Sequence, residues 1–184
     1  MALVIFGKSH CAISDKVIQR DDNFVCFPPF PSKPTDPLYK CSDGCVLRVE
    51  LENWKYKENV LEASKNFWLQ HYASSQMFTT IFRDDTYLVL HGTIENKIRI
   101  IFFQYGLVVD LPASLLSEIY NHIRHDFDEL HFQVYPNSLL TLEKDKERTR
   151  LMLTIKEVQQ DCIILSKDEW KRFCTLIQTI RQRK

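Results

Sequence analysis

The chain has 184 residues, of which 45% are hydrophobic, and its 24 basic and 24 acidic side chains give a formal net charge of zero. This composition is ample for a folded core and excludes a largely disordered chain. Neutrality argues against indiscriminate binding to nucleic acid, which depends on excess positive charge, although a local basic face is compatible with it. Because apolar runs are short, we expect neither a signal peptide nor a membrane span, and an intracellular protein.

The region 1–75 forms an N-terminal part of strands and one helix. Short strands are expected at Ala2–Phe6, Asn23–Phe27 and Val46–Trp54, with a proline-rich loop over 27–37 between them. A helix is expected over Asn59–Tyr72. Its buried side is predicted to hold Val60, Ala63, Phe67, Trp68 and His71. Strands followed by a helix also suit a degenerate third copy of the repeat described below.

Four cysteines lie within the first 45 residues: Cys11, Cys26, Cys41 and Cys45. In an intracellular chain we expect free thiols, and we predict no metal and no cofactor. A structural zinc site built from these cysteines around the loop, with His10 next to Cys11, is the alternative. Only Cys41 and Cys45 have a spacing close to that of zinc ligands.

A sheet-helix unit is predicted over 76–125. In the strand Lys97–Phe103, Ile98, Ile100 and Phe102 face one side, while Lys97, Arg99, Ile101 and Phe103 face the other. A helix is expected over 112–124, carrying Leu116, Ile119 and Ile123 on its apolar side.

A second unit is predicted over 130–184. The strand Arg148–Lys156 alternates between an apolar face and a basic face. Ser166 is the predicted N-cap of a final helix, with Glu169 completing a capping box, and the buried stripe holds Trp170, Phe173, Ile177 and Ile180. The basic pair Lys97 and Arg99 lies 51 residues before the pair Arg148 and Arg150. The apolar helix positions Leu116, Ile119 and Ile123 lie 54 residues before Trp170, Phe173 and Ile177, and the two spacings together suggest an internal repeat. Two unrelated strand-helix units could also match by chance.

The second unit resembles the single-strand DNA-binding domain of the transcriptional coactivator family known as positive cofactor four. The resemblance rests on a strand ending at Leu165, followed by Trp170, Phe173 and Ile177 in the helix. It covers about 130–181, and 77–124 more loosely, where Leu116 replaces the tryptophan and Pro112 takes the helix start. The family's Gly-rich loop and acidic or Ser-rich tail are absent here.

The resemblance implies an α+β fold of repeated antiparallel sheets, each with a C-terminal amphipathic helix. It also implies that two units pair through their helices, either as a pseudo-dimer within one chain or as a homodimer. Such a pair grips single-stranded DNA on aligned sheets. The two halves 76–125 and 130–184 would then supply one sheet each.

The predicted nucleic-acid-binding residues are cations on the open faces of two strands, two lysines in the turn before the second strand, and one aromatic side chain. They are Lys97, Arg99, Phe103, Lys144, Lys146, Arg148, Arg150 and Lys156. The alternative to a binding surface is an ordinary solvent-exposed sheet face, on which scattered lysines and arginines are common. Three acidic residues that alternate with Lys144 and Lys146 favour that alternative: Glu143, Asp145 and Glu147.

Nothing in the sequence indicates an enzyme, because no phosphate loop, nucleophile elbow or metal-binding histidine motif is present. We therefore expect a non-enzymatic protein that binds single-stranded or unwound DNA in transcription or replication, in the nucleus, with protein partners and without a membrane. A viral accessory protein also fits. The alternative function is a protein-interaction adaptor with a pleckstrin-like sheet-helix fold.

Overall fold

The computed structural model describes residues 4–94, 96–123, 128–135, 138–144, 148–155 and 158–182. The chain divides into two compact units. The first comprises 1–76, 83–88 and 101–108, and the second comprises 77–82, 89–100 and 109–184.

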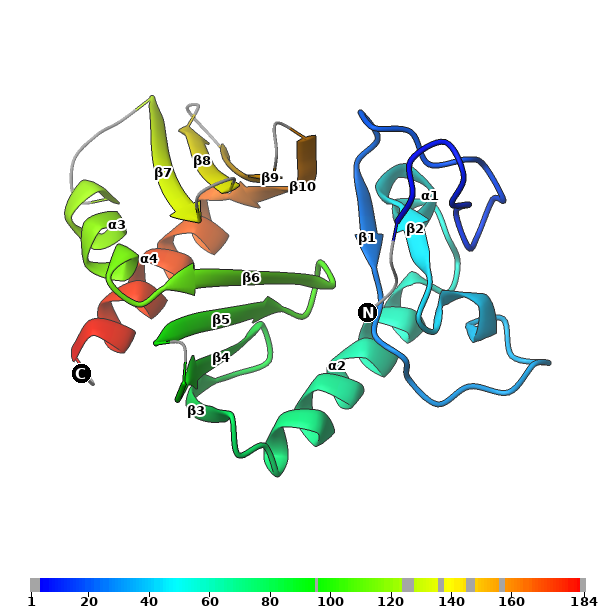
Figure 1. Ribbon diagram of the computed structural model, residues 1–184, viewed down its shortest axis with the longest axis horizontal. Coiled ribbons are helices and arrows are strands. Elements are labelled where there is room, and N and C mark those ends of the chain that lie inside the picture. The colour runs from blue at the N-terminus through cyan, green and yellow to red at the C-terminus, as the bar shows by residue number, and fades with distance from the viewer. Residues whose placement is uncertain are drawn as a thin grey trace. The chain divides into compact units, whose positions relative to one another are not determined.

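The N-terminal segment of the first unit holds two short strands and two helices (Figure 1). The elements are β1 Phe24–Cys26, a single 3-10 turn at Tyr39–Cys41, β2 Cys45–Leu47, α1 Arg48–Glu52 and α2 Lys57–Ala73. β1 and β2 pair in antiparallel register, with Cys26 opposite Cys45. The expected third copy of the repeat therefore corresponds here to a two-stranded sheet rather than a four-stranded one.

Two of the expected N-terminal strands differ from the structure. The strand predicted over Val46–Trp54 ends at Leu47, and α1 begins at Arg48, whose backbone N–H donates to the carbonyl of Asn23 at 2.8 Å. Beyond that bond the β1 partner ends, so no ladder continues the strand. Val4 to Phe6 forms no strand, because the chain turns there and Lys8 N–H donates to Ile5 O at 3.0 Å.

The predicted helix over Asn59–Tyr72 is confirmed as α2. Its buried stripe holds Val60, Leu61, Ser64, Trp68 and Tyr72. Ala63 and Phe67, predicted to be buried, are only partly so, and His71 is exposed. The buried face of the helix is thus rotated by about one residue from the predicted face: Leu61, Ser64 and Tyr72 are buried in place of Ala63, Phe67 and His71.

Four consecutive strands form one sheet in the order β3-β4-β5-β6. Their bounds are Phe78–Arg83, Tyr87–Gly92, Lys97–Phe102 and Leu107–Pro112. Short turns join neighbouring strands, as expected for an antiparallel meander. The predicted core positions of β5 are confirmed, because Ile98, Ile100 and Phe102 are each at most 1% exposed.

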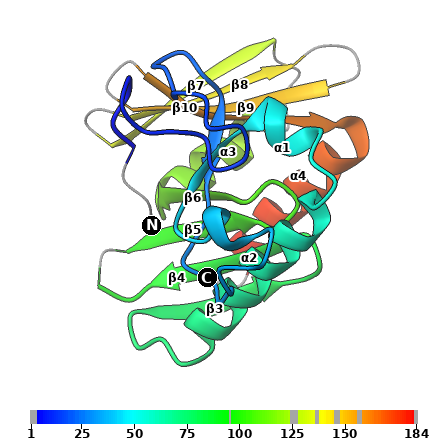
Figure 2. The same cartoon turned by 90° about the vertical axis from the view of Figure 1, so that its right-hand side faces the viewer.

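A second sheet has the order β10-β9-β8-β7, with every neighbouring pair antiparallel. Its strands are Glu129–Tyr135, Ser138–Lys144, Arg148–Ile155 and Val158–Ser166, from β7 to β10. Figure 2 shows these strands running side by side. The predicted strand Arg148–Lys156 is confirmed as β9 up to Ile155.

A helix follows each of these sheets: α3 Leu115–Ile123 and α4 Lys167–Gln182. α4 begins directly after Ser166, as its predicted cap position requires. In its predicted stripe, Phe173, Ile177 and Ile180 are at most 1% exposed, whereas Trp170 is only partly buried. α3 and α4 lie against each other, and α4 also packs on β9 and β10 (Figure 1). α3 starts later than predicted, because Pro112 still belongs to β6.

The predicted α+β class with antiparallel sheets is confirmed. From β3 onward the order of elements is four strands and a helix, then four strands and a helix again. Lys97 and Arg148 each open the third strand of their group, and Leu111 and Leu165 each lie near the end of the fourth. Common ancestry of the two groups and a pseudo-dimeric assembly remain predictions.

Within the part of the chain that the structure describes, no helix is long and apolar enough to cross a bilayer.

Candidate nucleic-acid interface

Strand β5 presents two of the predicted cations on one face. Because side chains alternate along a strand, Ile98 and Ile100 enter the core while Lys97 and Arg99 point to the opposite side. The side chains of Lys97 and Arg99 are 19% and 21% exposed. About four fifths of each side chain is therefore buried, and only a small part of each cation is exposed at the surface.

Asp110 on β6 binds both of these cations. Arg99 donates from Nε to Oδ1 and from Nη2 to Oδ2, each at 2.6 Å, and Lys97 Nζ lies 3.8 Å from Oδ2. Such a two-bond pair fixes the plane of the guanidinium group. Two of the predicted binding cations, Lys97 and Arg99, therefore share the carboxylate of Asp110.

Both cations also lie over the ring of Phe78, the first residue of β3. The Arg99 Cζ atom is 4.8 Å from the ring centroid, and Lys97 Nζ is 5.6 Å from it. These distances are typical of cation–π contacts, which stabilise a cation on an aromatic face. The arrangement joins an aromatic ring to a planar cation whose orientation Asp110 fixes.

A hollow of about 300 Å³ opens beside these side chains. Two exposed apolar residues border it, Met77 at 61% and Ile94 at 81% exposure. Gly92 lies in its wall, where a Cβ atom would be only 3.1 Å from Lys97 Cγ and 3.5 Å from Phe78 Cε1. Glycine thus allows the lysine stem and the ring to approach each other. We call Met77, Phe78, Ile94, Lys97 and Arg99 the β5 patch.

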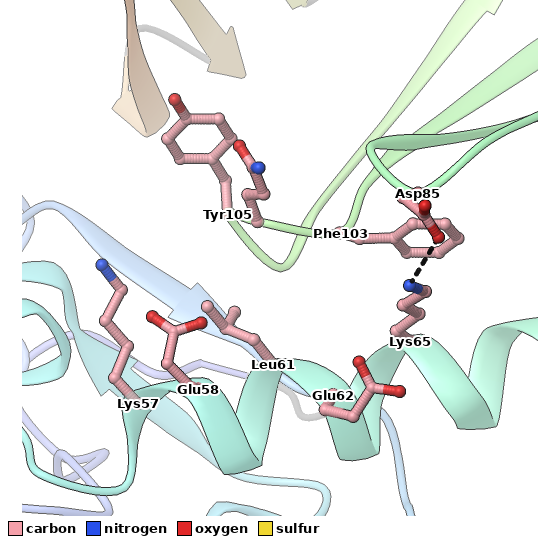
Figure 3. Close-up of a pocket in the computed structure, with 9 residues that line it drawn as sticks. Lys57, Glu58, Leu61, Glu62, Lys65, Asp85, Phe103 and Tyr105 are labelled. Atoms are coloured by element: carbon pink, nitrogen blue, oxygen red, sulfur yellow. Dashed lines mark hydrogen bonds and ion pairs between the residues drawn. The ribbon is translucent and has the colours of Figure 1, made fainter.

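Phe103, predicted to be a base-stacking residue, is buried and only 4% exposed. It lines a different hollow, of about 310 Å³, in the first unit, with Lys65 Nζ 5.5 Å from its ring centroid. Figure 3 shows Lys65 of α2 reaching Asp85, at 3.4 Å, beside this ring. Phe103 therefore offers no open face to a base, and its predicted role is wrong.

The remaining predicted cations belong to the second sheet. Lys144 is the last residue of β8 and is partly exposed. Arg148 and Arg150 are the first and third residues of β9, but their side chains lie outside what the structure describes. The backbone register places Glu143 directly opposite Arg150. Lys146 and Lys156 lie outside the described residues altogether.

Three patch residues and the carboxylate that organises them were not predicted: Met77, Phe78, Ile94 and Asp110. The signal for Asp110 was present, because it lies between the apolar Val109 and Leu111 on the open face of the next strand. Phe78 and Ile94 carry no such local signal. Their proximity to Lys97 depends on how β3, β4 and β5 pair.

The four N-terminal cysteines are not all free thiols. Cys26 and Cys45 form a disulfide, whereas Cys11 and Cys41 are buried and unbridged. This pairing corrects the expectation of reduced thiols. Among the described residues, no three His, Cys, Asp or Glu side chains are arranged to hold a metal ion.

No family model matches the chain, and no curated protein or solved structure matches it either.

Proposed function

We propose that the chain binds single-stranded or locally unwound DNA through the β5 patch. The observation that carries the proposal is the hollow in which Phe78, Met77 and Ile94 border Lys97 and Arg99. Proteins hold single strands by placing cations along the backbone and aromatic or apolar faces under the bases. The patch offers both kinds of group.

The apolar part of the patch favours unpaired strands over duplex. In a duplex the base faces are stacked inside the helix, so Met77, Ile94 and the Phe78 ring have nothing apolar to cover. An unpaired base presents its whole face, and stacking on a side chain contributes about 1–3 kcal/mol per base. The guanidinium of Arg99 lies over the Phe78 ring, so the two side chains form one stacked unit at the hollow.

The charge of the patch limits the electrostatic share of binding. Asp110 offsets part of the positive charge of Lys97 and Arg99, and the whole chain is neutral. Affinity therefore depends more on stacking than on release of counterions, and its salt dependence is shallow. Lys144, Arg148 and Arg150 on the second sheet extend the same proposal to a second surface, in keeping with the family resemblance.

We further propose that the chain acts in transcription or replication in the nucleus, together with protein partners. The proposed function is binding alone and includes no catalytic step. Two such surfaces grip two antiparallel strands of melted DNA if the units pair, within one chain or between two chains.

Fluorescence anisotropy with a labelled single strand, the matching duplex and a duplex with an unpaired bubble tests the proposal. We expect the single strand and the bubble to bind at least about tenfold more tightly than the duplex, since only they expose base faces. Equal affinity for all three, or tighter binding of the duplex, contradicts it.

A protein-interaction adaptor is the second candidate. One observation favours it: Ile94 and Met77 are exposed apolar side chains next to a partly neutralised charge cluster, and exposed apolar surface often marks protein contacts. A folded chain that binds none of the three DNA forms supports this candidate.

A further inference from the structure

The disulfide between Cys26 and Cys45 joins the two short strands of the first unit. The two residues lie opposite each other on β1 and β2, with their Cα atoms 4.1 Å apart. Each strand has only three residues, and the segment 27–44 between them, described throughout, holds the 3-10 turn. The cross-link therefore closes a long loop that has little regular structure of its own. We call β1, β2 and their disulfide the ribbon.

Two backbone hydrogen bonds continue the ribbon beyond the disulfide. Phe27 N–H donates to Gly44 O at 2.9 Å, and Asp43 N–H donates to Pro28 O at 3.2 Å. Five of the chain's seven prolines lie in the same loop, and proline has no backbone N–H group to donate. The two ends of the loop are therefore joined by the disulfide and a few bonds beside it.

The β1 side of the ribbon packs on the turn 103–106, which joins β5 to β6. Gly106 in this turn has a φ of +63°, and a Cβ atom there would be 3.0 Å from Phe27 Cε1 and 3.1 Å from Val25 Cγ2. Both of these buried residues are direct neighbours of Cys26 in the sequence. The turn therefore approaches the chain beside the disulfide as closely as glycine allows.

The β2 side of the ribbon holds the same turn by a hydrogen bond. Arg48, the first residue after β2, donates from Nη1 to Tyr105 O at 2.8 Å. Tyr105 and Phe103 line the hollow of about 310 Å³ beside α2 (Figure 3). Because both strands contact the turn that lines this hollow, a change in the ribbon should reach the turn.

Cys26 is the more accessible end of the disulfide. It is partly exposed, whereas Cys45 is only 6% exposed. When a thiolate of a dithiol reductant attacks the Cys26 sulfur, the S–S bond breaks and Cys45 leaves as a thiolate that takes up a proton. The second thiol of the reductant then displaces Cys26, and the reductant becomes a disulfide. Two electrons and two protons pass to the chain, which gains two thiols in place of one bridge.

We propose that the Cys26–Cys45 disulfide is a redox switch of local order in the first unit. When closed, it holds the loop 27–44 and the turn 103–106, and when it is reduced both open. Loss of a cross-link over a loop of this length raises the open population about 100-fold, because the loop regains chain entropy. The reduced chain keeps a core, since Ile18, Leu51 and Val60 lie outside the loop and are at most 1% exposed.

Hydrogen exchange of the full wild-type chain, oxidised and then reduced with dithiothreitol without denaturant, tests the switch. We expect 27–44 and 103–106 to exchange at least about tenfold faster after reduction, and α2 to change less than about twofold. Reoxidation should restore the protection. Equal exchange in the two states, or a disulfide that is reduced only in denaturant, overturns the proposal. An equal loss of protection over α2 overturns it too, because the bridge would then be a general structural cross-link.

Limited digestion with trypsin gives a second readout at a single bond. Lys33 precedes a proline, which blocks trypsin, so the loop is cut after Lys40, inside the 3-10 turn. With or without reductant, Cys26→Ser should be cut there at least about tenfold faster than the oxidised wild type. The matched control Cys174→Ser, altered on α4, should behave like the wild type in both states. Cutting of Cys26→Ser as slow as that of the oxidised wild type overturns the proposal. None of these results depends on DNA binding.

Discussion

Arg99 and Asp110 face each other across β5 and β6 and form two hydrogen bonds of 2.6 Å, Nε to Oδ1 and Nη2 to Oδ2. Both side chains are about a quarter exposed or less, at 21% and 25%. The pair keeps the guanidinium group over Phe78 and at the same time cancels its charge. The same contact therefore orders the β5 patch and weakens its attraction for phosphate.

Removing the negative charge of Asp110 should strengthen binding of single strands. In Asp110→Asn, the amide preserves the shape while the carboxylate no longer offsets the charges of Lys97 and Arg99, and we expect affinity to rise about fivefold at low salt. The dependence of affinity on salt should also steepen, by about 0.7 in the logarithmic slope. Anisotropy titrations over a salt series measure both, and an unchanged slope would count against the role given to Asp110.

Phe78 should contribute to binding through its ring rather than through charge. Phe78→Ala removes a stacking surface, so we expect affinity for a single strand to fall about 5- to 100-fold with an unchanged salt slope. Phe78→Tyr keeps the ring and serves as the matched control, with affinity within about twofold. If alanine and tyrosine behave alike in the same titrations, Phe78 does not stack on bases.

The α4 stripe should stabilise the fold independently of function. Ile177 is fully buried, so Ile177→Ala should lower the free energy of unfolding by about 2–5 kcal/mol. The neighbouring Gln178 is exposed, and Gln178→Ala should change it by no more than about 0.5 kcal/mol. Urea unfolding followed by circular dichroism compares the two. Similar losses in both variants would mean that α4 does not pack through this stripe.

Cys174 should make stability depend on pH in the alkaline range. Burial raises the pKa of its thiol from 9.0 to about 11, because the interior disfavours the thiolate. The contribution of the Cys174 thiol to the free energy of unfolding is thus fully present below pH 9 and is lost as pH rises through 11. The difference in unfolding free energy between the wild type and Cys174→Ser should therefore shrink between these values. A constant difference would show that Cys174 does not titrate in this way.

Local sequence pattern was sufficient for the parts of the fold that depend on near neighbours. The alternation along β5, the start of α4 after Ser166 and the buried positions Phe173, Ile177 and Ile180 all follow from period and capping. Each of these features is decided within one strand or one helix, where side-chain direction is a matter of spacing.

Features that depend on pairing between distant segments could not be predicted. Phe103 lies on the same strand face as Arg99 by count, yet Lys65 of α2 packs over its ring. The register of β5 against β6 decides that Asp110 meets Arg99, and no local pattern specifies it. The bridge between Cys26 and Cys45 is one of six possible pairs among the four N-terminal cysteines.

The most direct test of the central claim compares two double variants with the same loss of charge. Lys97→Ala with Arg99→Ala removes the cations of the β5 patch, while Arg20→Ala with Lys33→Ala removes one arginine and one lysine from exposed positions of the first unit. Single-strand affinity, measured by anisotropy at several salt concentrations, should fall at least about tenfold only in the first variant, with a smaller salt slope. Equal affinity in the two variants would contradict DNA binding by the β5 patch.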